Sequence, residues 1–202
     1  ADYDSRYSTE EYYWGLKPNR ICYDIMKILP PVKPYRVLDI GCGEGKDAVF
    51  FAKCGYGVTA FDISGPGIEK VKKLAEHNKT NVNFFQADIF DFRLEGEFDI
   101  IFSSGMFHFI PETHREELCG SLKNHTAAGG INALNVFVKK PFIARAPAST
   151  RDEGQRRPWH SGELFGYYHD WLFHICQEEI FDCMSGGTLH KHCMDTLIAQ
   201  KM

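Results

Sequence analysis

The chain has 202 residues, of which 44% are hydrophobic and 25% are charged, and its formal net charge is −4. This length suits one α/β domain over residues 1–202 and is too short for that domain plus a second full one. The negative charge argues against a general nucleic-acid binder, and no apolar run approaches the roughly 20 residues of a membrane span. We expect no secretory leader, and seven cysteines without a Cys-x-x-Cys pair favour reduced thiols in the cytoplasm.

The first 30 residues are expected to form a helical cap. Aromatic residues gather at Tyr12, Tyr13 and Trp14, and a helix is predicted over 18–29, ended by Pro30 and Pro31. Strands and helices then alternate as far as residue 138. The predicted strands are 35–40, 57–61, 82–86, 98–103 and 131–138, and the predicted helices are 47–54, 68–78 and 112–126, the last with a stop at Gly129-Gly130.

The C-terminal third has a different pattern. Residues 139–160 lack periodicity, are rich in Pro, Ala, Ser and Arg, and are expected to form a lid loop. Ser161 is a good N-cap for a short helix to Trp171, and the alternating segments 173–183 and 190–201 are predicted to pair antiparallel. The element order predicts a doubly wound, Rossmann-like α/β fold with a mostly parallel seven-stranded sheet and an antiparallel last strand.

The strand over 35–40 leads into a glycine-rich turn with Gly41, Gly43 and Gly45, and the next strand ends on Asp62. A strand, glycine turn, helix and acidic strand end suit a cofactor with a nucleoside. A dinucleotide site wants Gly-x-Gly-x-x-Gly so that the pyrophosphate sits on a helix N-terminus. Here Lys46 follows the third glycine and Asp39 precedes the first, and a carboxylate repels pyrophosphate but attracts an ammonium or sulfonium. S-adenosylmethionine is therefore the better fit.

The segment Leu38-Asp39-Ile40-Gly41-Cys42-Gly43-Glu44-Gly45 resembles motif I of the class I S-adenosylmethionine-dependent methyltransferases, whose last strand is also antiparallel. The resemblance implies that Asp39, Gly41, Cys42, Gly43 and Gly45 surround the methionine moiety, with Ser103 and Ser104 below it. It also implies that Asp62, with Ile63 beside it, takes the ribose hydroxyls, and that Asp88 and Ile89 hold the adenine. Alternatively, Asp62 and Asp88 cap the turns that follow their strands, and Cys42 is only a small residue in a tight loop.

The acceptor is expected beyond the fourth strand, where Phe107 and His108 face the transferred methyl group. His108 is the candidate catalytic base, although it can equally be a side chain packed between Phe107 and Phe109. DNA methyltransferases that act on exocyclic amines carry an Asn/Asp-Pro-Pro-Tyr/Phe motif at this place. That motif is absent here, so we expect a small-molecule acceptor, no nucleic acid, and a monomer or homodimer.

The expected lid has six basic residues against two acidic ones. One interpretation is a solvated loop, and the other is an anion-binding lid, because guanidinium groups bind oxyanions bidentately. The basic residues are Lys139, Lys140, Arg145, Arg151, Arg156 and Arg157, of which Arg145, Arg156 and Arg157 are the candidate substrate-binding residues, with Trp159 next to His160 closing the pocket. No metal is expected at His190-x-His192-Cys193, because residues 190 and 192 face one side of a strand and Cys193 the other.

Nearly the whole chain is similar to the tellurite-resistance (TehB-type) methyltransferases, including 55–62, 107–110, 162–171 and 196–199. The resemblance implies chalcogen oxyanions such as tellurite and selenite as acceptors, which need placement but no base. Family members carry a His-Arg pair between the last two strands, whereas this chain has Asp-Cys-Met-Ser-Gly-Gly at 182–187. The alternatives are an organic thiol, amine or carboxylate acceptor, an NAD-linked oxidoreductase, and a cofactor-binding module without catalysis.

Overall fold

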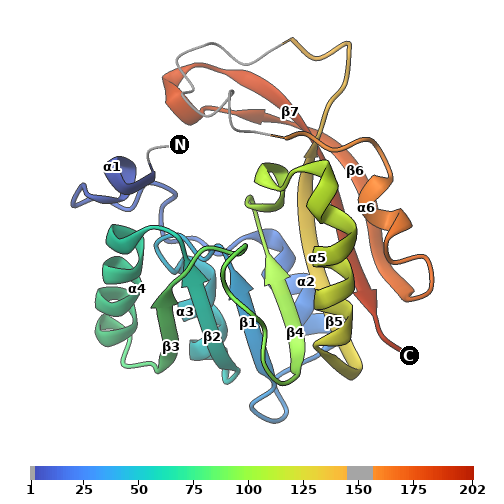
Figure 1. Cartoon of the computed structure of the whole chain (residues 1–202). Coiled ribbons are helices and arrows are strands. Elements are labelled where there is room, and N and C mark those ends of the chain that lie inside the picture. The colour runs from blue at the N-terminus through green and yellow to red at the C-terminus, as the bar shows by residue number, and fades with distance from the viewer. Residues whose placement is uncertain (1–2, 145–156) are drawn as a thin grey trace.

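The computed structural model describes residues 3–144 and 157–202, which are built on one seven-stranded sheet in the order β3-β2-β1-β4-β5-β7-β6 (Figure 1). All neighbours from β3 to β5 are parallel, while β7 runs antiparallel to both β5 and β6. The predicted fold class is therefore confirmed. The strands are β1 (Arg36–Ile40), β2 (Gly57–Asp62), β3 (Val82–Gln86), β4 (Phe98–Ser103), β5 (Thr126–Val138), β6 (Leu172–Cys183) and β7 (His190–Gln200).

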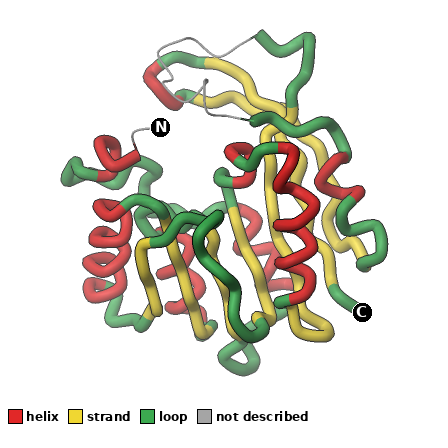
Figure 2. Tube along the Cα trace, viewed as in Figure 1, coloured by secondary structure: helices red, strands yellow, loops and turns green. Residues whose placement is uncertain are grey.

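Helices cover both faces of the sheet, as Figure 2 shows in red. The helices are α1 (Tyr3–Tyr7), α2 (Arg20–Ile28), α3 (Lys46–Cys54), α4 (Gly65–His77), α5 (Glu112–Asn124) and α6 (Glu163–Gly166), with 3-10 turns at Phe107–Phe109 and Ser185–Gly187. The predicted helical cap over residues 1–30 is helical only in part: from Tyr3 onward it holds the short helices α1 and α2, with a non-helical segment over 8–19 between them. None of the described helices has both the length and the apolar character that crossing a bilayer requires.

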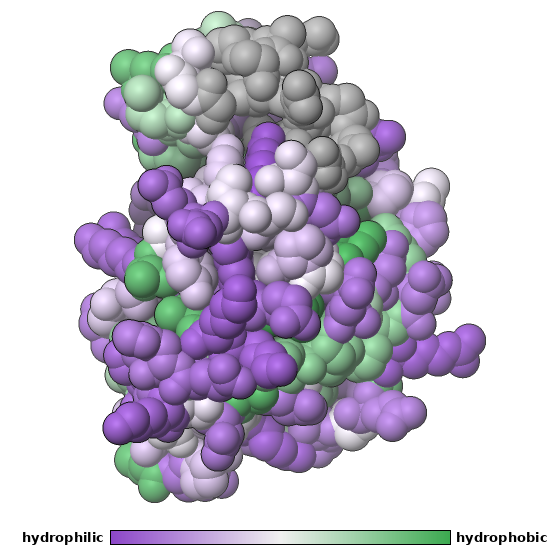
Figure 3. All heavy atoms as spheres, turned by 90° about the vertical axis from the view of Figure 1, so that its left-hand side faces the viewer, coloured by the Kyte–Doolittle hydropathy of each residue, from purple (hydrophilic) through white to green (hydrophobic). Residues whose placement is uncertain are grey.

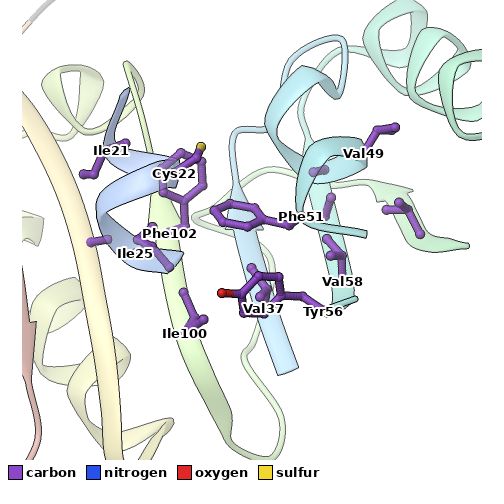
Figure 4. Close-up of a cluster of buried hydrophobic side chains, with 14 of the residues drawn as sticks. Ile21, Cys22, Ile25, Val37, Val49, Phe51, Tyr56, Val58, Ile100 and Phe102 are labelled. Carbon is purple, nitrogen blue, oxygen red and sulfur yellow. The ribbon is translucent and has the colours of Figure 1, made fainter. Parts of the chain in front are cut away.

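The alternation of side chains along the parallel strands creates two cores. Val37 of β1 faces α2 and α3, where it belongs to a cluster with Cys22, Phe51 and Phe102 (Figure 4). Leu38, its neighbour, faces the opposite side and belongs to the cluster beneath α5 and α6. Strands that are apolar on both faces explain the continuous hydrophobic runs in the sequence, because both faces of a parallel sheet are covered.

Two predicted helix boundaries are wrong. The helix that begins at Glu112 ends at Asn124, and β5 already begins at Thr126, so Gly129-Gly130 lies inside a strand. Pairing between β4 and β5 shifts register at this place, and a Cβ on Gly130 would lie 2.8 Å from the carbonyl oxygen of Asp99. The glycines therefore serve an irregular strand start rather than a helix end.

The second error concerns the helix expected after Ser161. The helix α6 is only four residues long, and its N-cap is Gly162 in the left-handed conformation. Ser161 instead donates a hydrogen bond to Glu178 of β6 (2.5 Å). A serine can cap a helix only when it occupies the N-cap position itself. Here that position is one residue later, at Gly162.

The outer face of α4 follows the sequence pattern with one exception. Hydrophilic side chains dominate much of the surface on the side of α1 and α4 (Figure 3), where Lys72 and Lys73 are exposed. Lys70 of the same helix is buried, and its ammonium lies 2.7 Å from the carboxylate of Glu44. This exception joins α4 to the glycine-rich turn.

Candidate active site

The glycine-rich turn joins β1 to α3 at the carboxyl end of the sheet. Gly41, Gly43 and Gly45 all have positive φ, which side chains with a Cβ rarely adopt. The amides of Gly41 and Cys42 donate to the carbonyl of Phe61 (2.9 and 3.0 Å), so the turn is held against the end of β2. A Cβ on Gly41 would lie 2.8 Å from the Cβ of Met106, which follows β4. The turn thus brings the ends of three strands together.

Asp39, on β1 just before the turn, is 2% exposed. Its Oδ2 atom has no hydrogen-bond partner among the described residues. Burial raises the pKa of Asp39 well above its usual range, and the neighbouring acids Asp47 and Asp62 raise it further. A buried carboxylate beside other acids needs a cation, and an ammonium group supplies both the charge and the missing hydrogen bond.

Asp62 ends β2 and accepts two backbone hydrogen bonds there. One carboxylate oxygen accepts from the amide of Gly43 (2.8 Å) and the other from that of Ser64 (2.9 Å). The helix α4 is capped by the hydroxyl of Ser64, which accepts from Gly67 (3.2 Å), and not by Asp62 itself. Burial raises the pKa of Asp62, and these amide hydrogen bonds oppose the rise. Each oxygen keeps a further lone pair for hydroxyl donors.

A cavity of about 530 Å³ opens above this edge of the sheet. Of the predicted cofactor residues, it is lined by Asp39, Gly41, Cys42, Gly43, Asp62, Ile63 and Ser104. A second hollow, of about 290 Å³, shares Gly41 and Asp62 with it and is lined by Asp88 and Ile89. The predicted methionine, ribose and adenine residues thus line two hollows that adjoin one another.

Two predicted cofactor residues lie behind this surface. Ser103 is buried, and its hydroxyl donates to the carbonyl of Ile40 (2.8 Å). Gly45 is the N-cap of α3, where a Cβ would lie 2.8 Å from a side-chain carbon of Val71 on α4. Both residues hold the turn in place and are absent from the described lining.

His108 lines the far end of the cavity and is 3% exposed. Its ring stacks on Phe137 of β5 (centroids 4.4 Å apart), and Phe137 stacks in turn on His192 of β7 (4.5 Å). Phe181 and Met194 line the same end. Of these residues, the sequence predicted only His108 as part of the acceptor site. Alternation along a strand fixes which residues share a face, but it does not tell which face meets the cavity.

The remaining predicted substrate residues take other places. Phe107 and Trp159 are fully buried, and the indole N–H of Trp159 donates to the carbonyl of Phe107 (3.0 Å). Arg157 is exposed at the surface, and its backbone amide lies 2.5 Å from the carbonyl oxygen of His108. The described residues that line the cavity do not include Phe107, Arg157 or Trp159. Arg145, Arg151 and Arg156 lie outside the described residues.

The N-terminal segment lies against the glycine-rich turn and lines part of the cavity. Glu44, within the glycine-rich turn, accepts from the amides of Tyr13 (3.1 Å) and Trp14 (3.3 Å) and pairs with Lys70. Tyr7 and Trp14 line the cavity and are joined by an indole-to-hydroxyl hydrogen bond of 3.1 Å. The segment before α2 therefore closes one side of the cofactor region.

Comparison with known proteins agrees with this geometry. Residues 37–130, from β1 to the start of β5, match the model of the methyltransferase domain family. Over these residues the chain carries a methyltransferase domain. The predicted family and the predicted cofactor are therefore confirmed for this domain, and the partnerless Asp39 is a structural feature that fits the cofactor's cationic end.

Relatives extend the similarity beyond the domain. The probable S-adenosyl-L-methionine-dependent methyltransferase TehB of Haemophilus influenzae is 27% identical over 191 residues, which cover 92% of this chain and 61% of that protein. Its crystal structure superposes with a TM-score of 0.79 at 23% identity and covers 99% of this chain and 66% of that chain. A 2-heptyl-1-hydroxyquinolin-4(1H)-one methyltransferase of Mycobacteroides abscessus is 34% identical over 122 residues, covering 59% of this chain and 54% of that protein. The chain thus spans between half and two thirds of the length of these relatives.

Proposed function

We propose that this methyltransferase domain transfers the methyl group of S-adenosylmethionine to a small molecule whose reacting atom is a soft chalcogen. The bound cofactor supplies an electrophilic methyl on a sulfonium, and the protein's part is alignment and exclusion of water. The observation that carries the proposal is the single cavity that joins Asp39 and Asp62 to an end lined by His108, Phe137, His192 and Met194.

The cofactor roles follow the placement of the acids. We assign Asp39 to the cofactor ammonium, because its unpartnered oxygen and acidic neighbours favour a cation there. Asp62 is assigned to the ribose hydroxyls and Ile63 to packing beside them, with Asp88 and Ile89 at the adenine in the adjoining hollow. The glycine-rich turn approaches the methionine moiety closely because it has no side chains at Gly41 and Gly43.

The acceptor end favours a small polarisable molecule. Aromatic rings and a thioether offer dispersion and sulfur–aromatic contacts, to which soft atoms respond best. We assign His108, which lines this end of the cavity, as the base that takes the proton when the acceptor arrives as a thiol. A tellurite- or selenite-type oxyanion needs no such base, and an organic thiol does.

A basic lid is not required for this proposal. Lys140, one of the described basic residues of 139–160, is engaged with the carboxylate of Glu178 (2.6 Å). Within the described lining, the basic side chains are Arg20 and Lys46, which come from α2 and α3. This arrangement favours the organic thiol over the oxyanion. All seven cysteines are free thiols, which agrees with a cytoplasmic, reducing setting for such chemistry.

The test is release of S-adenosylhomocysteine by the purified chain with S-adenosylmethionine and a panel of small thiols, selenite, tellurite, amines and a hydroxyquinolone. Turnover confined to chalcogen acceptors supports the proposal, and the ratio of thiol to oxyanion rates decides between the two classes. His108→Asn should lower the rate of thiol methylation near neutral pH, whereas the rate with an oxyanion should stay within about threefold of the parent's. Turnover only with amines or the hydroxyquinolone would overturn the chalcogen assignment.

A further inference from the structure

The hairpin between β6 and β7 extends past the carboxyl ends of the parallel strands and reaches toward the side of α1 (Figure 1). Its tip carries three side chains that ligate metals, Cys183, His190 and His192. One ligand atom of each, the cysteine sulfur and a ring nitrogen of each histidine, lies within 4.8 Å of the other two. Cys183 and Ser185 line the same cavity as His192.

The strand register explains why these three meet. Cys183 is the last residue of β6 and pairs directly with His190, the first residue of β7. His192 is two residues further along β7 and therefore shares a face with His190. Cys193 points the other way and is 2% exposed in the core, as the sequence indicated. The sequence excluded Cys193 as a ligand beside the two histidines; the cysteine that lies beside them is Cys183, across the hairpin.

The protonation of His190 can be inferred from its partners. Its Nδ1 lies 2.7 Å from the carbonyl oxygen of Thr188, and since a carbonyl only accepts, Nδ1 must carry the proton. In the neutral ring the lone pair is then on Nε2, which lies 3.0 Å from Nε2 of His192. A histidine that donates one nitrogen to a backbone carbonyl and presents the other to a cluster has the outer-sphere arrangement typical of a metal ligand.

The other groups around the cluster also suit a metal. The rings of Phe137 and Phe181 lie beside His192, with centroids 4.5 and 5.9 Å from its own. The sulfur of Cys183 accepts from the backbone amide of Ser185 (3.4 Å) and donates to the Ser185 hydroxyl (3.1 Å), so the turn of the hairpin holds it in place. His190 is 8% exposed, so the ligand set lies at the boundary between an apolar shell and the cavity.

We propose that Cys183, His190 and His192 bind a thiophilic divalent metal ion, best matched by Zn²⁺, whose fourth position faces the methyl-acceptor cavity. Zinc takes cysteine and histidine ligands in a tetrahedron, with bonds of about 2.3 Å to sulfur and about 2.0 Å to nitrogen. Nitrogens in such a tetrahedron lie roughly 3.3 Å apart, close to the 3.0 Å between the two histidines. Hard cations such as Mg²⁺ prefer oxygen ligands and do not match this set.

The open position deepens the proposed function, on which this last step rests. A thiol that coordinates the metal loses its proton to solvent or to a nearby base and is held as a thiolate. The thiolate sulfur then forms a bond to the methyl carbon while the bond from that carbon to the cofactor sulfonium breaks, which gives a thioether and S-adenosylhomocysteine. The neutral thioether is a weaker ligand than the thiolate, so the product can leave the metal.

The test uses the purified chain, stripped with a chelator and titrated with Co²⁺ alone as a spectroscopic substitute for Zn²⁺. We expect one ion per chain, with the intense visible bands of a tetrahedral site and a thiolate-to-cobalt charge-transfer band. Cys183→Ser and His190→Gln should each weaken binding by about 100-fold or more, and excess Mg²⁺ should not compete. Circular dichroism spectra and melting curves of the metal-free variants check that they fold.

Two variants on the same strand are matched controls. Cys176→Ser and His174→Gln replace exposed residues of β6 away from the cluster and should bind cobalt as the parent does. Equal cobalt binding by Cys183→Ser and Cys176→Ser, or no binding by the parent, would overturn the metal site. A small thiol added without S-adenosylmethionine should shift the cobalt bands, and an unchanged spectrum would overturn thiol ligation. Neither result depends on turnover, so the proposed function is tested separately.

Discussion

The parallel and antiparallel halves of the sheet assemble their parts of the site in different ways. In the parallel half, Asp39 lies on β1 just before the turn, Asp62 ends β2 and Asp88 follows β3, so the fold gathers them at one edge. In the antiparallel half, Phe137, Phe181 and His192 come from three strands and meet through the register of β5, β7 and β6. Topology alone places the predicted cofactor residues, whereas placement of the proposed acceptor residues also needs the register and the extension of a hairpin.

The two halves also differ in how firmly they are packed. Four of the five residues of β1 are buried, whereas no residue of β6 is. The exposed side chains of β6 can therefore change without disturbing a core, whereas the four buried ones of β1 cannot. One cofactor-binding scaffold can therefore be combined with many acceptor sites, in agreement with the general separation of fold from function.

The largest effect is expected where the parallel half binds the N-terminal segment. Lys70→Met leaves Glu44 buried without its cation and should lower the free energy of unfolding by about 3 kcal/mol or more. In a domain of this size, that corresponds to a fall in melting temperature of about 6–12 °C. Differential scanning calorimetry measures it, and Lys72→Met, an exposed position on the same helix, is the control. Equal melting temperatures for the two variants would show that the buried pair does not stabilise the fold.

Asp39→Asn should separate binding from stability. Without the carboxylate, the affinity for S-adenosylhomocysteine should fall by about 100-fold, because a buried charge-assisted pair with its ammonium contributes about 2–3 kcal/mol. Since the raised pKa of Asp39 means that its ionised form opposes folding, the cofactor-free variant should be at least as stable as the parent at pH 7. Calorimetric titration and melting curves measure the two quantities. Parent-like affinity would contradict the ammonium assignment, and Asp91→Asn, an exposed acid, controls for charge.

In the antiparallel half, loss of a buried hydrogen bond should affect stability alone. Trp159→Phe leaves the carbonyl of Phe107 without its indole donor and removes buried volume, at a cost of about 2 kcal/mol. The melting temperature should fall by about 4–8 °C, while the affinity for S-adenosylhomocysteine stays within about twofold of the parent's. The control is Trp171→Phe, which changes a half-buried tryptophan shortly after α6 and should lower the melting temperature less than Trp159→Phe does. A large loss of cofactor affinity in Trp159→Phe would mean that the halves are coupled.

The smallest predicted effect depends on pH. Burial, together with the neighbouring Glu178, raises the pKa of Asp195 to about 6, although the amide of Gly162 opposes the rise. The native state then holds a proton that the unfolded state, with a pKa of about 3.9, has released. Stability from this proton is complete below about pH 4 and is lost as the pH rises to about 6. Asp195→Asn imitates the protonated form.

The advantage of Asp195→Asn over the parent should therefore grow between pH 4 and pH 7. At pH 7 the melting temperature of Asp195→Asn should exceed that of the parent by about 2–4 °C. This corresponds to about 1 kcal/mol, because solvent partly screens the site. Melting curves at half-unit pH intervals measure the effect. An advantage that shrinks as the pH rises would show that Asp195 is ionised at all these pH values. Asp182→Asn, at an exposed position of the same hairpin, should give a flat difference.

The parts that sequence predicts well are those fixed by local periodicity. Strands β3 and β4 begin and end at the predicted residues, and Asp39, Asp62 and Asp88 reach the expected edge because parallel strands end together. The pairing of Cys183 with His190 could not be predicted, since it depends on where the hairpin turns and on which residues oppose one another. Trp159 is a prediction of the opposite kind, since the sequence suggested a role that the structure does not give it. An aromatic residue next to a basic segment suggested a pocket wall, yet Trp159 is fully buried.

The strand order also has a consequence for synthesis of the chain. Because β7 lies between β5 and β6, the sheet cannot close until residues 190–200 have left the ribosome. Until then β5 presents an unpaired edge of backbone donors and acceptors, and β6 has no neighbour of its own. A chain that stalls or is cut before residue 190 keeps an intact glycine-rich turn but exposes that edge. We therefore expect incomplete chains to aggregate through β5 and to be recognised by chaperones there.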